Sequence, residues 1–86
     1  MKRLVADVTG TVQGVGFRSF VYRSAAQLGI SALADNMDDG SVRVIASGDE
    51  QRLLRLVTLL RQGSRYSSVD RVDYTLTDSD EKREGS

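Results

Sequence analysis

The stretch that decides the fold runs Arg3-Leu-Val-Ala-Asp-Val-Thr-Gly10-Thr-Val-Gln-Gly14-Val-Gly16-Phe-Arg18. Residues 3–9 alternate between two faces, one of them apolar, and this period of two predicts a half-buried strand. Residues 10–16 contain three glycines, which predicts a loop with unusual backbone angles. From residue 17 to 28 apolar side chains recur at helical spacing, and Gly29 follows as a stop signal. The stretch therefore predicts a strand joined to a helix by a glycine-rich loop.

Two more strands and a second helix are predicted in the middle of the chain. The segments 30–37 and 41–47 alternate, and the Asp39-Gly40 pair between them predicts a β-hairpin. The run Ser47-Gly-Asp-Glu50 fits a capping box, in which the serine would begin a helix. Leucines at helical spacing then predict a helix that ends before Gly63.

The last alternating segment, residues 71–76, predicts a final strand. The resulting order is β-α-β-β-α-β, and each helix is apolar along one stripe only. Right-handed crossovers then favour a ferredoxin-like α+β sandwich, an antiparallel sheet with two helices on one face. We expect one domain over residues 1–77 and a flexible polar C-terminal tail over 78–86, where no apolar side chain occurs.

The composition limits the chemistry that the chain can perform. Its 86 residues carry 12 basic and 12 acidic side chains, and this zero net charge argues against a nucleic-acid partner. No apolar run is long enough for a membrane helix or a signal peptide, so we expect a cytoplasmic protein without a membrane partner. The absence of His and Cys excludes imidazole proton shuttles and thiolate sites, and the carboxylates lack calcium-loop spacing. We therefore expect no metal site and no cofactor.

The glycine-rich loop and the helix start behind it favour an anion site. The first amides of a helix lack partners inside the helix, and the helix dipole gives that end a partial positive charge. Gly14 and Gly16 would let further amides converge there, and Arg18 adds a guanidinium that matches phosphate oxygens. The dinucleotide fingerprint fails because Ser19 stands where its third glycine belongs, and the Walker loop fails because no lysine is near. A plain glycine-rich turn with a solvated Arg18 is the alternative.

A longer run of residues resembles a known family. Gly10-Thr-Val-Gln-Gly-Val-Gly-Phe-Arg18 resembles the signature loop of the acylphosphatases, small ferredoxin-like enzymes that hydrolyse carboxyl-phosphate anhydrides. Asn36-Met-Asp-Asp-Gly-Ser-Val42 resembles the second motif of that family, an Asn before a turn and a valine-rich strand. The similarity covers residues 3–76.

The resemblance implies a metal-independent, cofactor-free hydrolase of small acyl phosphates, with inorganic phosphate as its product and competitive ligand. The catalytic pair of the family falls on Arg18, which would bind the phosphate, and on Asn36, which would orient the attacking water. We also expect a monomer. The phosphate cradle would be formed by the loop amides of Gln13, Gly14, Val15, Gly16, Phe17 and Arg18.

Some residues depart from the pattern of the family or allow another interpretation. Thr11 and Asp35 stand where many relatives have a basic residue. We expect Asp35 to face away from Asn36, because neighbours on a strand point to opposite faces. Asp38 and Asp39 could form a carboxylate pair for acid–base chemistry, but beside a glycine we interpret them as turn formers.

Two functions from other classes stay open. A ferredoxin-like sheet can bind RNA across its open face, although that mode uses exposed aromatic side chains and the strands here offer Val, Ala and Leu. A non-catalytic anion-sensing module would keep the cradle without turnover. Micromolar RNA binding would support the first, and phosphate binding without hydrolysis would support the second.

Overall fold

The computed structural model describes residues 1–78 and arranges them as six elements in the predicted order. The helices match the expected periods closely, whereas the first and last strands are longer than the alternation alone predicted. The elements are β1 (Lys2–Thr11), α1 (Phe17–Leu28), β2 (Ser31–Asn36), β3 (Val42–Gly48), α2 (Glu50–Gln62) and β4 (Ser68–Asp78).

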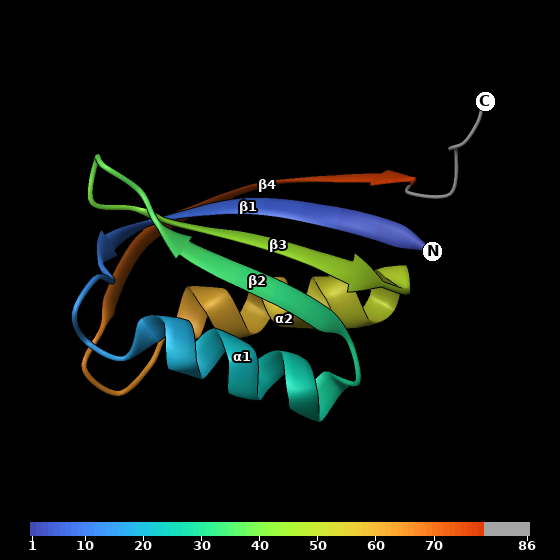
Figure 1. Ribbon diagram of the computed structural model, residues 1–86, viewed down its shortest axis with the longest axis horizontal. Helices are drawn as coiled ribbons and strands as arrows, with labels where there is room; N and C mark the ends of the chain where they lie inside the picture. Colours follow the sequence, from blue (N-terminus) through green and yellow to red (C-terminus); the bar gives the residue numbers. More distant parts are fainter. Residues whose placement is uncertain (79–86) are drawn as a thin grey trace.

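The four strands form one antiparallel sheet in the order β2-β3-β1-β4. Both helices cover the same face of this sheet, and the other face is open (Figure 1). Within residues 1–78, neither helix is long and apolar enough to cross a membrane. The ferredoxin-like α+β sandwich expected from the sequence is confirmed.

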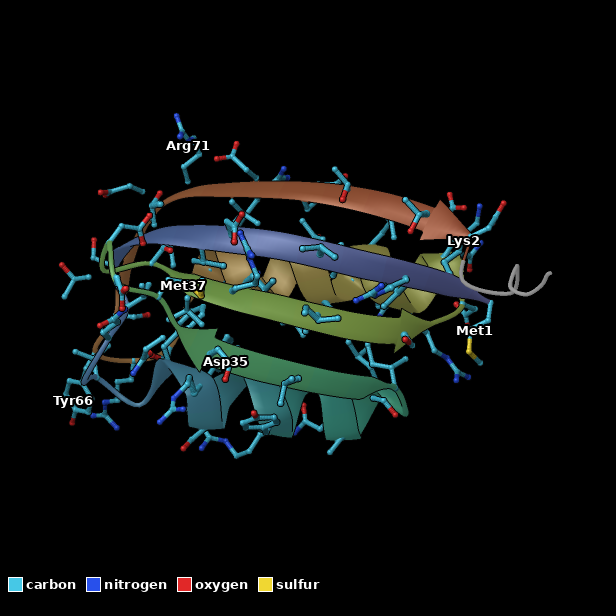
Figure 2. All side chains as sticks on the ribbon, turned by 45° about the horizontal axis from the view of Figure 1, so that its top comes forward. Met1, Lys2, Asp35, Met37, Tyr66 and Arg71 are labelled. Carbon is cyan, nitrogen blue, oxygen red and sulfur yellow. The ribbon has the colours of Figure 1, made fainter. Side chains whose placement is uncertain are left out.

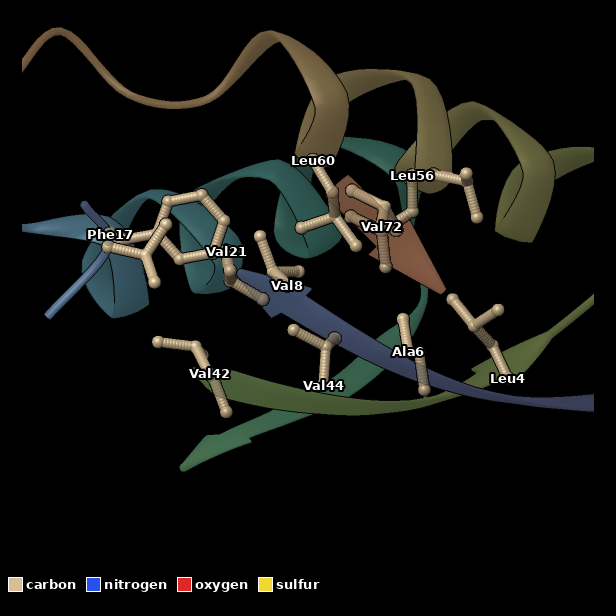
Figure 3. Close-up of a cluster of buried hydrophobic side chains, with 14 of the residues drawn as sticks. Leu4, Ala6, Val8, Phe17, Val21, Val42, Val44, Leu56, Leu60 and Val72 are labelled. Carbon is tan, nitrogen blue, oxygen red and sulfur yellow. The ribbon is translucent and has the colours of Figure 1, made fainter. Parts of the chain in front are cut away.

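The core lies between the sheet and the helices, where side chains from both layers meet (Figure 3). Alternate residues of β1 and β3 are buried there, together with one stripe of each helix. Burial of each large apolar side chain in this way stabilises the folded state by roughly 1.5–3 kcal/mol relative to leaving it exposed to water. The largest fully buried side chains are Phe17, Leu4, Leu53, Leu56, Leu60, Val8, Val12, Val21, Val42 and Val44.

The predicted capping box at the start of α2 is wrong. Ser47 lies inside β3, where it pairs with Arg3 of β1, and the residue that caps α2 is Asp49. The Asp49 carboxylate accepts a hydrogen bond from the amide of Arg52 at 2.9 Å. Pairing with β1 therefore keeps the chain extended through Gly48 and moves the helix start by two residues.

β1 also continues past the predicted boundary at residue 9. The strand reaches Thr11 because its pairing with β4 resumes after an irregularity between Thr9 and Gly10. Gly10 has a φ of 129°, and a Cβ at this position would overlap the carbonyl oxygen of Ser68. Only glycine fits this close approach of two strands.

At the other end of the sheet, β4 extends to Asp78, whose carboxylate lies 2.8 Å from the ammonium group of Lys2. Asp78 is the first residue of the predicted tail, so ordered structure reaches one residue beyond the predicted domain end at 77. Residues 79–86 of that tail lie outside the described residues, and its flexibility stays a prediction.

Candidate active site

The candidate site lies where β1 and β2 end and α1 begins, at the left of Figure 1. A cavity of about 350 Å³ opens there between the glycine-rich loop, the first turn of α1 and the last residue of β2. The fold thus brings Arg18 and Asn36 to one cavity, although they are separated by a helix and most of a strand. The residues that line this cavity are Val12, Gly14, Gly16, Phe17, Arg18, Ser19, Tyr22 and Asn36.

The loop that borders the cavity turns through two glycines with left-handed backbone angles. Gly14 has a φ of 74° and Gly16 a φ of 78°. A Cβ at either position would meet no other atom within 4 Å, so the requirement is for the backbone angle and not for space. Glycine adopts this region without the steric penalty that other residues suffer. The next residue, Phe17, is buried in the core and anchors the end of the loop.

The amino end of α1 has no cap of its own. Its N-cap residue is Gly16, which has no side chain to accept a hydrogen bond, and its first turn contains no acidic residue. The other helix differs at both points, since α2 has the Asp49 cap and Glu50 in its first turn. The first amides and the positive dipole end of α1 are thus left for an external anion.

The guanidinium of Arg18 stands in this first turn and has no carboxylate partner among residues 1–78. Its side chain is exposed, and no acidic side chain of residues 1–78 lies within ion-pair distance of it. A cation at the amino end of a helix is opposed by the helix dipole, so Arg18 costs the helix some stability. A ligand anion would offset both positive charges.

Asn36 is the last residue of β2, directly before the turn that leads to β3. The side chain of Gln13 joins the glycine-rich loop to this turn: its Nε2 donates to the carbonyls of Met37 and Ser41, at 2.8 Å in each case. Loop and turn are thereby held together. Because one of the two carbonyls belongs to Met37, the residue after Asn36, this contact helps to keep Asn36 beside the loop.

The six predicted cradle residues do not all face the cavity. Gly14, Gly16, Phe17 and Arg18 line it. The side chain of Gln13 is engaged with the β2–β3 turn, and Val15 packs against the core. Phosphate binding by the amides of these residues stays a prediction.

The turn itself is organised by Asp39. Its carboxylate accepts hydrogen bonds from the amide and the hydroxyl of Ser41, at 3.0 Å and 2.6 Å. These two bonds hold the pKa of Asp39 below its usual value. The prediction that Asp39 is a turn former is confirmed, and its engagement with Ser41 argues against a carboxylate pair with Asp38.

Asp35 lies on the opposite face of the sheet from the site, as expected. It is directly opposite Arg43 on β3, and Arg43 in turn forms an ion pair with Asp7 at 2.8 Å. Figure 2 shows Asp35 on the open face of the sheet. The acidic residue next to Asn36 is therefore separated from Arg18 by the sheet itself.

Tyr22 lines the cavity without having been predicted as a site residue, as do Val12 and Ser19. It lies four residues after Arg18, one turn further along the same side of α1, and it lines the same cavity. The sequence feature that points to it is a tyrosine four residues after Arg18, which places an aromatic ring with a hydroxyl group on the same side of the helix. Its hydroxyl contacts the backbone of β2, as described below.

A larger hollow of about 600 Å³ lies at the opposite end of the sheet, near Gly29 and the start of α2. There the helix amide of Arg52 is already bonded to Asp49, so this hollow does not offer an uncapped helix end. Among residues 1–78, no three acidic side chains are grouped so that they could hold a metal ion. Within the part of the chain that the structure describes, Arg18 without an ion-pair partner, the uncapped start of α1 and the Asn36 carboxamide meet at one cavity.

Comparison with known proteins identifies the family. A family model described as Acylphosphatase matches residues 4–85. The chain belongs to the acylphosphatase family. An acylphosphatase from Deinococcus radiodurans is 52% identical over 71 residues, which are 83% of this chain and 82% of that protein. Another, from Caldanaerobacter subterraneus, is 47% identical over 74 residues, which are 85% of this chain and 82% of that protein.

Solved structures of acylphosphatases have the same fold as this chain. The crystal structure of acylphosphatase from Bacillus subtilis matches with a TM-score of 0.88 at 37% identity, over 92% of this chain and 88% of that one. The predicted family and the predicted hydrolase function, that of an acylphosphatase, are confirmed. The similarity does not assign roles to single residues, and the roles of Arg18 and Asn36 stay predictions.

Proposed function

We propose that this acylphosphatase hydrolyses small acyl phosphates in the Arg18 cavity, without a metal ion or another cofactor. Arg18 and the free amides at the start of α1 would hold the phosphoryl group, and Asn36 would orient the attacking water. The observation that carries the proposal is the meeting of an unpaired guanidinium, an uncapped helix end and a carboxamide in one cavity.

The reaction needs no nucleophile from a side chain and no covalent intermediate. The water oxygen attacks phosphorus, and the bond between phosphorus and the acyl oxygen breaks in line with it. The carboxylate leaves with the bonding electron pair. One proton of the water goes to a phosphoryl oxygen and the other stays on the attacking oxygen, which gives inorganic phosphate. The tasks left to the protein are to position the two reactants and to stabilise the charge on the phosphoryl oxygens.

Each of these tasks has a candidate group in the cavity. The guanidinium of Arg18 presents a planar fork of donors that matches two phosphoryl oxygens. Helix amides and dipole stabilise the same oxygens without any change of protonation. The carboxamide of Asn36 can both donate to and accept from a water molecule, so it can aim the nucleophile without acting as a base.

The test is phosphate release from benzoyl phosphate in the presence of EDTA. We expect turnover by the natural chain and losses of about 10²–10³ in kcat/KM for Arg18→Ala and for Asn36→Ala. Arg43→Ala is the matched control, because this arginine lies on the open face of the sheet and pairs with Asp7. Circular dichroism checks that each variant is folded. Natural rates in both site variants would refute the proposed roles.

The alternatives from the sequence predict other results. The central strands β1 and β3 present Val5, Asp7, Arg43 and Ile45 to the open face, where an RNA-binding sheet would present aromatic rings. An anion sensor would bind phosphate and release none from an acyl phosphate. The monomeric state and the cytoplasmic location expected from the sequence stay predictions.

A further inference from the structure

Tyr22 makes an unusual contact with the edge of the sheet. β2 is an edge strand, so its backbone groups on one side have no neighbouring strand. The Tyr22 hydroxyl accepts a hydrogen bond from the amide of Ala34 at 3.0 Å and donates one to the carbonyl of the same residue at 3.3 Å. One hydroxyl therefore satisfies both outward-facing backbone groups of Ala34.

This contact is made two residues before Asn36. Along an antiparallel strand, the direction of the backbone groups and of the side chains repeats every second residue. Asn36 therefore presents its side chain on the same face as Ala34, whose own side chain is buried against the helices. A contact that fixes Ala34 relative to α1 therefore also restrains the backbone of Asn36 and the face on which its carboxamide lies.

The helix that carries Tyr22 also carries Arg18, one turn earlier on the same side. The tyrosine thus links the element that holds the cation to the strand that holds the carboxamide. On the far side of Asn36, the side chain of Gln13 is bonded to the carbonyl of Met37. Asn36 lies between two tethers, and only the one from Tyr22 comes from the helix of Arg18.

We infer that Tyr22 is a positioning residue, whose hydroxyl holds the end of β2 so that Asn36 faces the phosphoryl group bound at Arg18. The inference rests on the proposed role of Asn36. A displacement of about 1 Å at a reacting group can cost on the order of 10²-fold in rate. Loss of one tether out of two will let Asn36 shift without releasing it.

Tyr22→Phe is a clean test because it removes one oxygen and keeps the ring. Tyr22 as a whole is 42% exposed, so the change leaves no defect in the core. With benzoyl phosphate we expect kcat to fall about tenfold, while the inhibition constant of inorganic phosphate changes less than about twofold, because Arg18 and the loop stay in place. Tyr74→Phe is the matched control, since Tyr74 lies on β4, the opposite edge of the sheet. It should keep the natural kcat.

A double-mutant cycle shows whether Tyr22 acts through Asn36. In an Asn36→Ala background the hydroxyl has no carboxamide to position, so adding Tyr22→Phe should change kcat by less than about twofold. An equal loss in both backgrounds would overturn the inference. If Asn36→Ala alone keeps the natural kcat, the role proposed for Asn36 fails, and this failure is visible independently of Tyr22.

A second readout does not depend on turnover. In the phosphate-bound protein, the side-chain amide resonances of Asn36 should shift or broaden in Tyr22→Phe and stay in place in Tyr74→Phe. Unchanged Asn36 resonances would overturn the inference. A competing role for the hydroxyl is to block pairing of β2 with a second chain. A loss of kcat that appears only together with concentration-dependent self-association would favour that role and refute ours.

Discussion

Two arginines of this chain show how a neighbour changes what a guanidinium can do. Arg43 is bonded to Asp7, and this contact raises the pKa of the already charged arginine. Arg18 has no such partner among the described residues and stands where the helix dipole opposes it. A charge that is left unpaired at a small cost in stability is available to a substrate, whereas a paired one first has to be released.

The carboxylate of Asp39 provides a residue-scale prediction. Its hydrogen bonds with the hydroxyl and amide of Ser41 lower its pKa in the folded chain. A group with a lowered pKa stabilises the fold above its unfolded pKa, about 3.9 for Asp, and this stability is lost as the pH falls through the folded value. We expect Ser41→Ala to raise the pKa of Asp39, because the hydroxyl bond is the largest cause.

The measurement is a titration of the Asp39 side-chain carboxyl by NMR from neutral to acidic pH. The decline in thermal stability below pH 4 should also be shallower in Ser41→Ala than in the natural chain, since the folded and unfolded pKa values lie closer together. Ser31→Ala, an exposed serine on β2, is the control. An unchanged Asp39 pKa in Ser41→Ala would contradict the cause assigned here.

Among the elements, the two helices illustrate what can be predicted from local sequence. The bounds of α1 follow from Gly16 and Gly29, whose φ values of 78° and 70° are the left-handed angles that the pattern suggested. The predicted start of α2 is wrong because Ser47 and Asp49 are both good N-cap residues. The choice between them depends on the pairing of Ser47 with Arg3, which no local pattern reveals.

The parts of the site that can be predicted are likewise those that depend on local sequence and not on contacts between distant residues. Motifs predict Arg18 and Asn36, and the backbone requirement of the loop predicts its glycines. No local pattern predicts the two tethers, because Gln13 reaches residues 24 and 28 positions away and Tyr22 reaches one 12 positions away. Contacts of that kind exist only once the chain has folded.

The cap of α2 supports a prediction at the scale of one element. Asp49→Ala should lower the free energy of unfolding by about 1 kcal/mol, because the amide of Arg52 loses its acceptor. The rate of acyl phosphate hydrolysis should not change, since Asp49 lies at the end of the sheet opposite to the cavity. Urea denaturation and the phosphate-release assay measure the two quantities.

Asp73→Ala is the comparison for this variant. Asp73 forms an exposed ion pair with Arg71 at 2.8 Å, and such surface pairs contribute little. If the two substitutions destabilise the chain equally, the cap is not the cause of the loss. A lower hydrolysis rate in Asp49→Ala would show instead that the two ends of the sheet are coupled.

For the whole molecule, binding and stability are linked. An anion that binds only the folded cavity adds RT ln(1 + [L]/Kd), about 1.4 kcal/mol at ten times its dissociation constant. For a chain of this length, that should raise the Tm by roughly 6–11 °C. We expect inorganic phosphate to have this effect on the natural chain and to lose most of it in Arg18→Ala.

Differential scanning fluorimetry over a phosphate titration measures this shift. Sodium chloride at matched ionic strength controls for general screening of the surface charges. An equal rise in Tm for Arg18→Ala would mean that phosphate acts elsewhere on the chain. A natural chain whose Tm does not respond to phosphate would contradict an anion site at the start of α1.

The missing cap of α1 has one more consequence. Asp49 is a permanent part of α2, whereas the matching acceptor for α1 would be a phosphoryl oxygen that arrives with the substrate and departs with the product. On the proposed chemistry, the first turn of α1 is held by the buried Phe17 and by the bond from the Phe20 amide to the Gly16 carbonyl, and the ligand only replaces water at its free amides. The helix end would then be capped once in every catalytic cycle, by the same oxygens whose charge it stabilises.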